Sequence, residues 1–296
     1  MNKINIALIT GFLGSGKTSF LKNYAKKNKS RRIVYLVNEF SPTDIDSKFL
    51  SSEISDIISI PGGSIFCKCL VSEFIKHLRE IPQKFHDIEG VIIEASGIAN
   101  TNSISKMLLE SRLDNIFNLT RILAIIFPDT FLKLLHTLPN IKTQIETADT
   151  VIINKIDIST PAKIAESEEK IITINPNCKI IKTLYANTNI ELFEKRQKLF
   201  TNGEYSSCRD PNYTAFSTDY SFSKKELELI TSKFKNSIYR IKGWINSTYL
   251  DYSGNFWNFI PGQDKNENIT VWIVDGVEAK KIISYISSEF KTKIQT

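Results

Sequence analysis

Cysteine and histidine are scarce in this sequence: four cysteines and three histidines occur in 296 residues. A chain of this length needs no disulfides to stabilise its core, so closely spaced cysteines are better explained by metal or redox chemistry. Only Cys67 and Cys69 are close together, and we expect Cys178 and Cys208 to be structural. Cys67 and Cys69 are therefore the candidate metal ligands among the cysteines.

Long apolar runs are also absent. No run approaches the ~18–20 residues that a membrane-spanning helix needs. The first residues, MNKINIALITG, lack the small-residue cleavage site of a signal peptide. We therefore expect a cytoplasmic protein with no membrane partner.

Neither sign of charge dominates. The 38 lysines and arginines face 32 aspartates and glutamates, which gives a formal net charge of +6. The densest basic cluster, between Lys26 and Arg32, follows a predicted helix, and a solvated loop explains it better than a nucleic-acid site. The hydrophobic fraction of 42% excludes a disordered chain, and no short repeat suggests a fibrous one. We expect a globular protein with a main domain of roughly 200 residues and a smaller second one.

Short, continuous apolar runs alternate with helical patterns over about the first 190 residues. The runs that predict strands are residues 3–9, 33–37, 91–94, 121–127 and 150–154. The patterns that predict helices are residues 17–27, 69–80, 102–113 and 130–147, the last broken or kinked at Pro139. Runs without alternation are typical of parallel strands covered on both faces. The sequence therefore predicts an α/β fold, a doubly wound and mostly parallel sheet with its ligand site at the carboxyl ends of the strands.

The regular pattern is lost at residues 201–218, where turn-forming residues accumulate. We therefore expect a nucleotide-binding domain at residues 1–200, a linker at 201–218 and a smaller α+β domain at 219–296. Within the smaller domain, the helices expected are residues 223–235 and 277–291, and the strands are residues 238–250, 255–259 and 269–274.

Residues 11–18, GFLGSGKT, match the phosphate-binding pattern G-x4-G-K-[ST] in full, between a predicted strand and a predicted helix. The glycines allow backbone N–H groups to wrap phosphates, and the helix N-terminus adds partial positive charge. Lys17 should reach the β- and γ-phosphates, and the Thr18 hydroxyl should bind Mg²⁺. We expect electrostatic catalysis by Lys17, Mg²⁺ and backbone amides. The nucleotide-binding residues predicted here are Gly11, Gly14, Ser15, Gly16, Lys17, Thr18 and Ser19.

The sequence Asn154-Lys155-Ile156-Asp157 directly follows the fifth apolar run, where GTPases carry the N-K-x-D motif that reads guanine. The Asp157 carboxylate would accept hydrogen bonds from guanine N1–H and the exocyclic amine, a pairing that adenine does not offer. The Lys155 stem would cover the base, and Asn154 would tie this loop to the phosphate-binding turn. GTP is therefore predicted over ATP, which disfavours an ATP-dependent small-molecule kinase.

An acidic residue, Glu94, ends the third apolar run. A carboxylate at this position holds the Mg²⁺ shell or positions water, and glutamate in place of the usual aspartate indicates contact through water or a role as base. The N–H of Gly97 could approach the γ-phosphate. In the loop after the second run, Glu39, Asp44 and Asp46 are candidate Mg²⁺ or water contacts, with a plain surface loop as the alternative.

In their order along the chain, TGFLGSGKTS, VIIEASGIA and QIETADTVIINKID resemble the CobW-type P-loop GTPases, relatives of the nickel-insertion GTPases for urease and hydrogenase. The likeness covers about residues 1–200, and RIKGW at 240–244 resembles that family's R-x-K-G segment. It implies a GTPase that couples its nucleotide state to delivery of a metal ion or metal-containing cofactor to a client protein. Since no convincing arginine finger is present, turnover should be slow, on the order of 10⁻⁴–10⁻² s⁻¹.

The metal motif of that family, G-C-x-C-C, corresponds to residues 63–67, of which only the last cysteine is retained, while Cys69 is an addition. Cys67 and Cys69 supply two thiolates, and a delivery site needs about three ligands. The third would come from Glu39 or from the client. Lys68 between the cysteines favours the thiolate form, and with it Zn²⁺, Co²⁺ or Ni²⁺ binding or redox reactivity. The alternative is that no metal binds and that Cys69 is a buried residue opening a helix.

Two functions follow from the resemblance. In the first, GTP orders residues 38–46, Glu39 approaches Cys67 and Cys69, and hydrolysis releases the metal. In the second, the protein is a GTP-dependent switch that activates a cofactor enzyme, such as a corrinoid enzyme, and binds no metal itself. The expected partner is a client metalloenzyme or cofactor-dependent protein, without nucleic acid, and the protein itself is a monomer or a nucleotide-dependent dimer.

Overall fold

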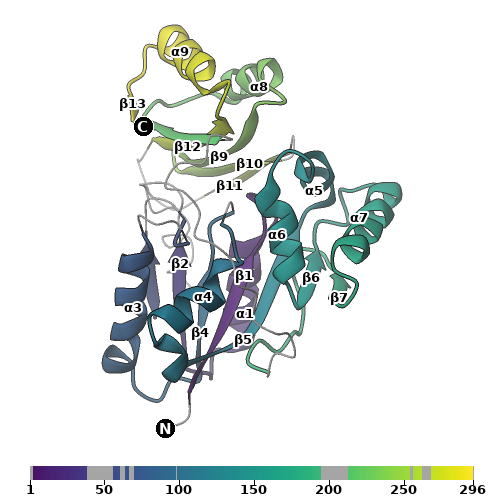
Figure 1. The fold of residues 1–296 in the computed structure, drawn as a ribbon. Helices are drawn as coiled ribbons and strands as arrows, with labels where there is room; N and C mark the ends of the chain where they lie inside the picture. The colour runs from purple at the N-terminus through teal and green to yellow at the C-terminus, as the bar shows by residue number, and fades with distance from the viewer. Residues whose placement is uncertain are drawn as a thin grey trace. The chain divides into compact units, whose positions relative to one another are not determined.

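Seven parallel strands form the sheet of the N-terminal part of the computed structural model (Figure 1). Their order across the sheet is β3-β2-β4-β1-β5-β6-β7. The strands are β1 Ile4–Thr10, β2 Ile33–Asn38, β3 Ile57–Ile60, β4 Gly90–Glu94, β5 Phe117–Ile126, β6 Thr150–Ile153 and β7 Lys179–Lys182. The chain runs outward from β1 to both edges, which confirms the doubly wound parallel sheet.

The structure describes residues 3–38, 56–60, 64–66, 70–97, 99–194, 213–253, 256–261 and 268–295. The chain divides into two units, Met1–Cys208 and Arg209–Thr296. Along the described residues, no helix has both the length and the apolar character needed to cross a bilayer.

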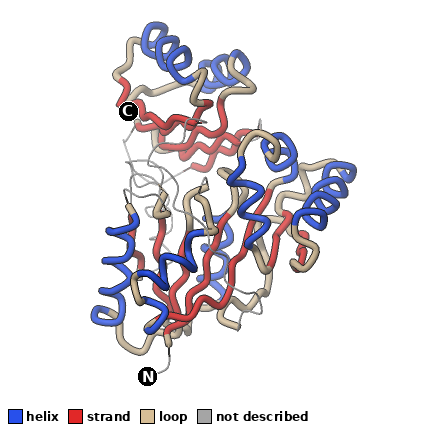
Figure 2. The backbone as a smooth tube through the Cα atoms, viewed as in Figure 1, coloured by secondary structure: helices blue, strands red, loops and turns tan. Residues whose placement is uncertain are grey.

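Helices cover both faces of the parallel sheet (Figure 2). The helices are α1 Lys17–Lys27, α3 Val71–Lys84, α4 Ser103–Glu110, α5 Pro128–Leu134, α6 Pro139–Thr147 and α7 Pro161–Ile174, with a 3-10 turn at Leu113–Asn115. One apolar cluster packs α3 and α4 on β1, β2 and β4, and a second packs α1 on the opposite face. Pro139 is the first residue of α6, so the expected helix at residues 130–147 is two helices.

Among the described residues of this unit, two strands and one helix escaped the sequence analysis. The strands β3 and β7 lie at the two edges of the sheet and have four residues each. Edge strands are covered less completely than central ones, so they lack the long apolar run that reveals a buried strand. Helix α7 buries only Ser167 and Ile171, and its remaining polar surface hides the helical period.

As far as its residues are described, the second unit is a six-stranded antiparallel sheet with two helices. The sheet order is β11-β10-β9-β12-β8-β13. Its elements are β8 Tyr213–Thr218, α8 Lys224–Lys233, β9 Ile238–Ile245, β10 Thr248–Ser253, β11 Phe256–Pro261, β12 Ile269–Asp275, α9 Ala279–Phe290 and β13 Ile294–Gln295. Both helices bury apolar residues against one face of the sheet, around the stacked rings of Phe216 and Trp272. An α+β architecture is therefore confirmed for this part of the chain.

Two assignments in this unit need correction. Residues 213–218, which the sequence analysis placed in the linker, form β8, which pairs antiparallel with β12. The run at residues 238–250 is two strands, since Asn246 and Ser247 both adopt positive φ and turn the chain back on itself. Such two-residue turns match the twist of a hairpin.

Arg31, in the loop between α1 and β2, ties together three segments of the first unit. Its Nε donates to Glu89 Oε2 at 2.7 Å, and its NH1 donates to Glu191 Oε2 at 2.7 Å. The guanidinium carbon also lies 5.3 Å from the centre of the Phe193 ring. Although burial opposes ionisation, the hydrogen bond from Arg31 holds the pKa of Glu191 below its usual value. The pair therefore stabilises the fold while Glu191 is ionised.

Replacing Arg31 by Met should lower the free energy of unfolding by about 1–2 kcal/mol, since it removes charge-assisted hydrogen bonds to the half-buried Glu191 and the exposed Glu89. Urea unfolding of wild type and variant measures the difference. The loss should shrink as the pH falls below about 4, because a carboxyl with a lowered folded pKa contributes stability that disappears on protonation.

The matched control is Arg32→Met. Arg32 lies 3.9 Å from Asp87, and the two side chains are 59% and 92% exposed. Such a pair should contribute less than about 0.5 kcal/mol. Equal losses for the two variants would contradict the special role of Arg31.

Candidate nucleotide-binding site

The turn between β1 and α1 has the backbone shape of a phosphate loop. Gly11, Gly14 and Gly16 all have positive φ, at 134°, 75° and 110°. Gly16 is the residue before the first turn of α1, and a Cβ there would lie 2.3 Å from Asn154 Nδ2. No acidic side chain lies in the first turn of α1. The N–H groups and the positive helix end are therefore available to an anion.

Polar groups line this turn. Lys17 is buried and its Nζ donates to Gly11 O at 2.9 Å, so the ammonium lies over the loop. The hydroxyls of Thr10, Ser15 and Ser96 are buried without a hydrogen-bond partner among the described residues. Leaving buried hydroxyls unsatisfied is costly, so a polar occupant such as a phosphate fits the site. Thr18 is half-buried and Ser19 is exposed.

Asn154, the first residue after β6, connects the phosphate loop to a third segment. Only 1% of the residue is exposed. Its Nδ2 donates to Ser15 O at 2.8 Å, and its Oδ1 accepts from Ala186 N at 2.7 Å. Lys155 has a φ of 59° and places its Nζ 5.0 Å from the centre of the Phe127 ring, while Asp157 is exposed. The structure thus brings Asn154 to the phosphate loop and leaves the Asp157 carboxylate accessible.

The loop after β7 belongs to the same site and was missed from the sequence. Tyr185 and Ala186 both have positive φ. Asn23 Nδ2 donates to Tyr185 O at 2.8 Å. Lys27 Nζ donates to Asn187 Oδ1 at 2.6 Å, Thr188 O at 3.0 Å and Asn189 Oδ1 at 2.8 Å. The run Asn187-Thr188-Asn189 is a turn signal, but only the fold reveals that α1 holds it beside Asn154.

The end of β4 lies next to the phosphate loop. Glu94 is buried and pairs in register with Ile9 of β1 and Val37 of β2. Gly97 approaches the phosphate loop so closely that a Cβ there would lie 2.7 Å from Leu13 N. The strand ends that carry Glu94 and Gly97 therefore meet the loop that carries Lys17.

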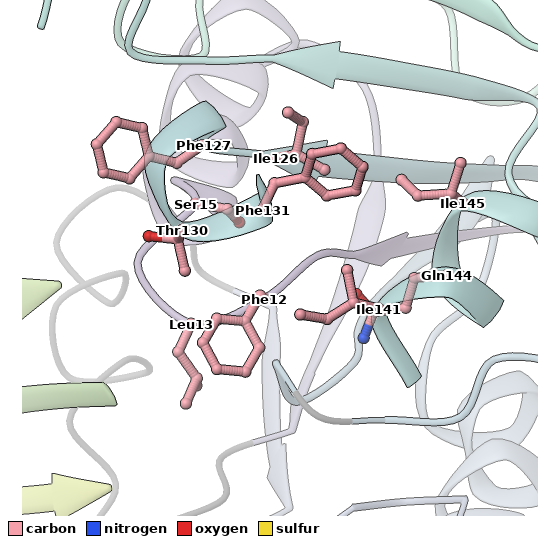
Figure 3. Close-up of a pocket in the computed structure, with 10 residues that line it drawn as sticks. All are labelled: Phe12, Leu13, Ser15, Ile126, Phe127, Thr130, Phe131, Ile141, Gln144 and Ile145. Carbon is pink, nitrogen blue, oxygen red and sulfur yellow. The ribbon is translucent and has the colours of Figure 1, made fainter. Parts of the chain in front are cut away.

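A small pocket behind the phosphate loop is formed by that loop, α5 and α6 (Figure 3). It is lined by Phe12, Leu13, Ser15, Ile126, Phe127, Thr130, Phe131, Ile141, Gln144 and Ile145. Gln144 Nε2 donates to Gly97 O at 3.3 Å and to Ala99 O at 3.2 Å. A volume of about 10 Å³ leaves room for about one water molecule, so the pocket serves packing rather than ligand binding.

The ligands predicted for the delivered metal, Cys67, Cys69 and Glu39, lie outside the described residues. Of the predicted Mg²⁺ ligands, Asp44 also lies outside them, while Thr18 and Glu94 are described, and Asp46 and Cys208 are not. Within the described part of the chain, no group of three or more His, Cys, Asp or Glu side chains could hold a metal ion. Cys178 is half-buried just before β7. The metal site therefore stays a prediction.

A parallel sheet with a glycine-rich turn between β1 and α1, closed by an asparagine from the end of β6, defines a P-loop nucleotide-binding domain. Residues 5–182, more than half of the chain, match the family model for the CobW/HypB/UreG nucleotide-binding domain. The chain belongs to this family, as the motifs predicted.

The relatives of the chain include proteins with metal-related names. The zinc-regulated GTPase metalloprotein activator 1 of Schizosaccharomyces pombe is 26% identical over 193 residues, which are 62% of this chain and 47% of that protein. The zinc chaperone YeiR of Escherichia coli is 32% identical over 166 residues, 55% of this chain and 48% of that protein. The chain thus spans about half the length of each of these curated relatives.

A solved structure of a Zn(II)-bound triple mutant of the YjiA GTPase aligns with 97% of this chain and 99% of its own, with a TM-score of 0.50 and 17% identity. At this identity, the likeness shows the fold alone.

Replacing Lys27 by Met should loosen the loop after β7. The variant keeps the aliphatic stem and loses the three hydrogen bonds to residues 187–189, which should cost about 1 kcal/mol. Hydrogen exchange of the Asn187 amide, which donates to Leu184 O at 3.0 Å, should therefore accelerate about five- to tenfold. Lys29→Met, an exposed position two residues away, should leave the exchange rate unchanged. Equal rates in wild type and Lys27→Met would show that Lys27 does not anchor this loop.

Proposed function

We propose that this protein binds and slowly hydrolyses GTP, and that it couples its nucleotide state to the delivery of a metal ion, zinc above all, to a client protein. The observation that carries the proposal is the buried Asn154 amide, which joins the phosphate loop to the loop after β7. The family membership and the names of the relatives support both parts of the proposal.

Hydrolysis is proposed to rest on electrostatics and positioning. The Lys17 ammonium and the N–H groups at the start of α1 would face the β- and γ-phosphates, and Gly97 N–H would face the γ-phosphate. Glu94, buried at the end of β4, would orient the attacking water or accept its proton. Thr18 and Asp44, with Glu94 through water, would hold Mg²⁺, which when bound neutralises charge on the phosphates.

Selection of guanine is proposed to rest on Asp157. The carboxylate is exposed, while Asn154 and Lys155 before it are fixed by the contacts described above. A carboxylate on a rigid support can accept both hydrogens of the guanine N1 and N2 groups. Ser15, Gly16 and Ser19 would complete the nucleotide contacts from the phosphate loop.

Metal delivery is proposed to use Cys67 and Cys69 with Glu39 or a ligand from the client. Two thiolates and one further ligand leave a position open, which suits transfer better than permanent binding. The second candidate is a GTP-dependent switch that activates a cofactor enzyme without holding metal. It is favoured by the loss of two of the three family cysteines.

Replacing Asp157 by Asn should weaken GTP binding about ten- to a hundredfold and leave ATP binding unchanged, since the amide presents a donor to the guanine N–H groups. Competition titration with GTP and ATP measures the ratio. Xanthosine triphosphate should bind the variant better than the wild type, because its C2 oxygen accepts a hydrogen bond from the amide. Asp87→Asn, at an exposed aspartate before the amino end of β4, is the control. An unchanged GTP-to-ATP ratio in Asp157→Asn would contradict the assignment.

Titrating the reduced protein with Zn²⁺, Co²⁺ and Ni²⁺ tests metal binding, once with a non-hydrolysable GTP analogue and once with GDP. Metal delivery predicts 1:1 binding that differs between the two nucleotides and is lost in Cys67→Ser/Cys69→Ser. Cys178→Ser, next to β7, should behave as wild type. Absence of metal binding in both nucleotide states would contradict delivery and favour the switch.

A further inference from the structure

A buried amide at the end of β2 joins four segments of the chain. Asn38 is 4% exposed. Its Oδ1 accepts from Ser96 N at 3.2 Å and from Ile65 N at 3.1 Å, and its Nδ2 donates to Ile60 O at 3.1 Å. One side chain thus connects the ends of β2, β3 and β4 to the segment at residues 64–66.

The first of these partners belongs to the nucleotide site. Ser96 follows Glu94 by two residues and precedes Gly97, whose backbone approaches Leu13 of the phosphate loop. A shift of the Ser96–Gly97 backbone toward or away from a terminal phosphate would therefore move a group that is hydrogen-bonded to Asn38.

The second partner leads to the cysteines in the sequence. Ile65 and Phe66 are fully buried, and the Phe66 ring packs edge to face on Phe74 of α3, with centroids 6.0 Å apart. Ser64 Oγ accepts from Phe66 N at 3.3 Å. The next residue along the chain is Cys67. A firmly packed three-residue segment therefore separates the Asn38 amide from the first candidate metal ligand.

The hydrogen bonds of the Asn38 amide favour the transfer of a backbone movement from Ser96 to Ile65. Because Nδ2 is held by Ile60 O on β3, the amide plane cannot rotate toward Ser96 without breaking a buried hydrogen bond. The two N–H groups share one oxygen, and little water can reach the site to replace either of them. A displacement of the Ser96 backbone should therefore displace the Ile65 backbone as well.

We propose that Asn38 couples the backbone at Ser96 and Gly97 to the segment at residues 64–66, which precedes the cysteine pair in the sequence. The nucleotide state then sets the position of residues 64–66 and, through them, the affinity of Cys67 and Cys69 for metal. The metal half of this proposal rests on the proposed function. Asn38 acts here as a positioning residue, since it touches neither the nucleotide nor the metal.

The test measures two quantities in the full chain, with a GTP analogue and with GDP. The first is the ratio of Zn²⁺ dissociation constants in the two nucleotide states, and the second is hydrogen exchange of the Ile65 amide, which needs no metal. Asn38→Leu removes the side-chain hydrogen bonds to Ile60, Ile65 and Ser96 at similar volume. It should bring the Zn²⁺ ratio to within twofold of one and accelerate Ile65 exchange more than tenfold in both states.

Asn38→Asp keeps an acceptor oxygen for the Ser96 and Ile65 N–H groups and replaces the donor to Ile60 O by a second acceptor. It should retain part of the nucleotide dependence that Asn38→Leu loses. Asn118→Leu, an exposed asparagine near the amino end of β5, should behave as wild type. GDP affinity within about threefold of wild type would show that each variant keeps its nucleotide site folded.

The outcomes separate the two proposals. If the wild type binds no Zn²⁺, metal delivery fails, and the exchange measurement still decides the coupling. If the wild type shows nucleotide-dependent Zn²⁺ binding and Asn38→Leu keeps the same ratio, the coupling through Asn38 is overturned and metal delivery stands. Ile65 exchange that is equal in both nucleotide states of the wild type would also overturn it.

Discussion

The nucleotide site depends above all on the buried Asn154 amide. Its donor and its acceptor are both used within the protein, on Ser15 O and Ala186 N, so the phosphate loop and the loop after β7 share one fixed point. Glycine at position 16 follows from this contact, because any side chain there would displace Asn154 Nδ2. Buried and hydrogen-bonded through both its nitrogen and its oxygen, the amide fixes the geometry before a nucleotide arrives, which lowers the ordering cost of binding.

A second buried amide, Asn38, lies at the same carboxyl ends of the strands, on the other side of the site. Asn154 follows β6 and Asn38 ends β2, so the two lie on opposite sides of the central strand β1. Each uses its side chain to bind backbone groups of segments that follow neighbouring strands, which would otherwise be left unpaired. The Asn154 side and the Asn38 side of the site are thus organised by the same kind of contact. Only the Asn38 side continues toward the cysteine pair in the sequence.

Much of the architecture could be predicted from sequence, and the failures have a common cause. The central strands are long apolar runs, and the glycine turn at residues 11–16 carries its own signature, so β1, α1 and the doubly wound sheet were predictable. The sequence did not predict β3, β7 or the hairpin at Asn246. Short edge strands and turns owe their conformation to partners distant in sequence. The site shows the same division. Asn154 was predicted from its motif, while Ala186 and Lys27 enter the site only because the fold brings β7 and α1 together.

The contacts of Asn38 suggest how a motif with two cysteines in place of three could still serve metal delivery. A structural zinc site with four ligands binds too well to release its ion, whereas two thiolates are an incomplete set whose affinity depends on whatever supplies the next ligand. Incomplete sites are sensitive to small displacements, because the third ligand either reaches the ion or does not. The segment at residues 64–66 is held by Asn38 and by the packing of Phe66 on α3, and under the proposed coupling it would pass on such a displacement. In the proposed metal delivery, the loss of two family cysteines would leave the affinity to depend on the position of the segment at residues 64–66, which precedes Cys67 in the sequence.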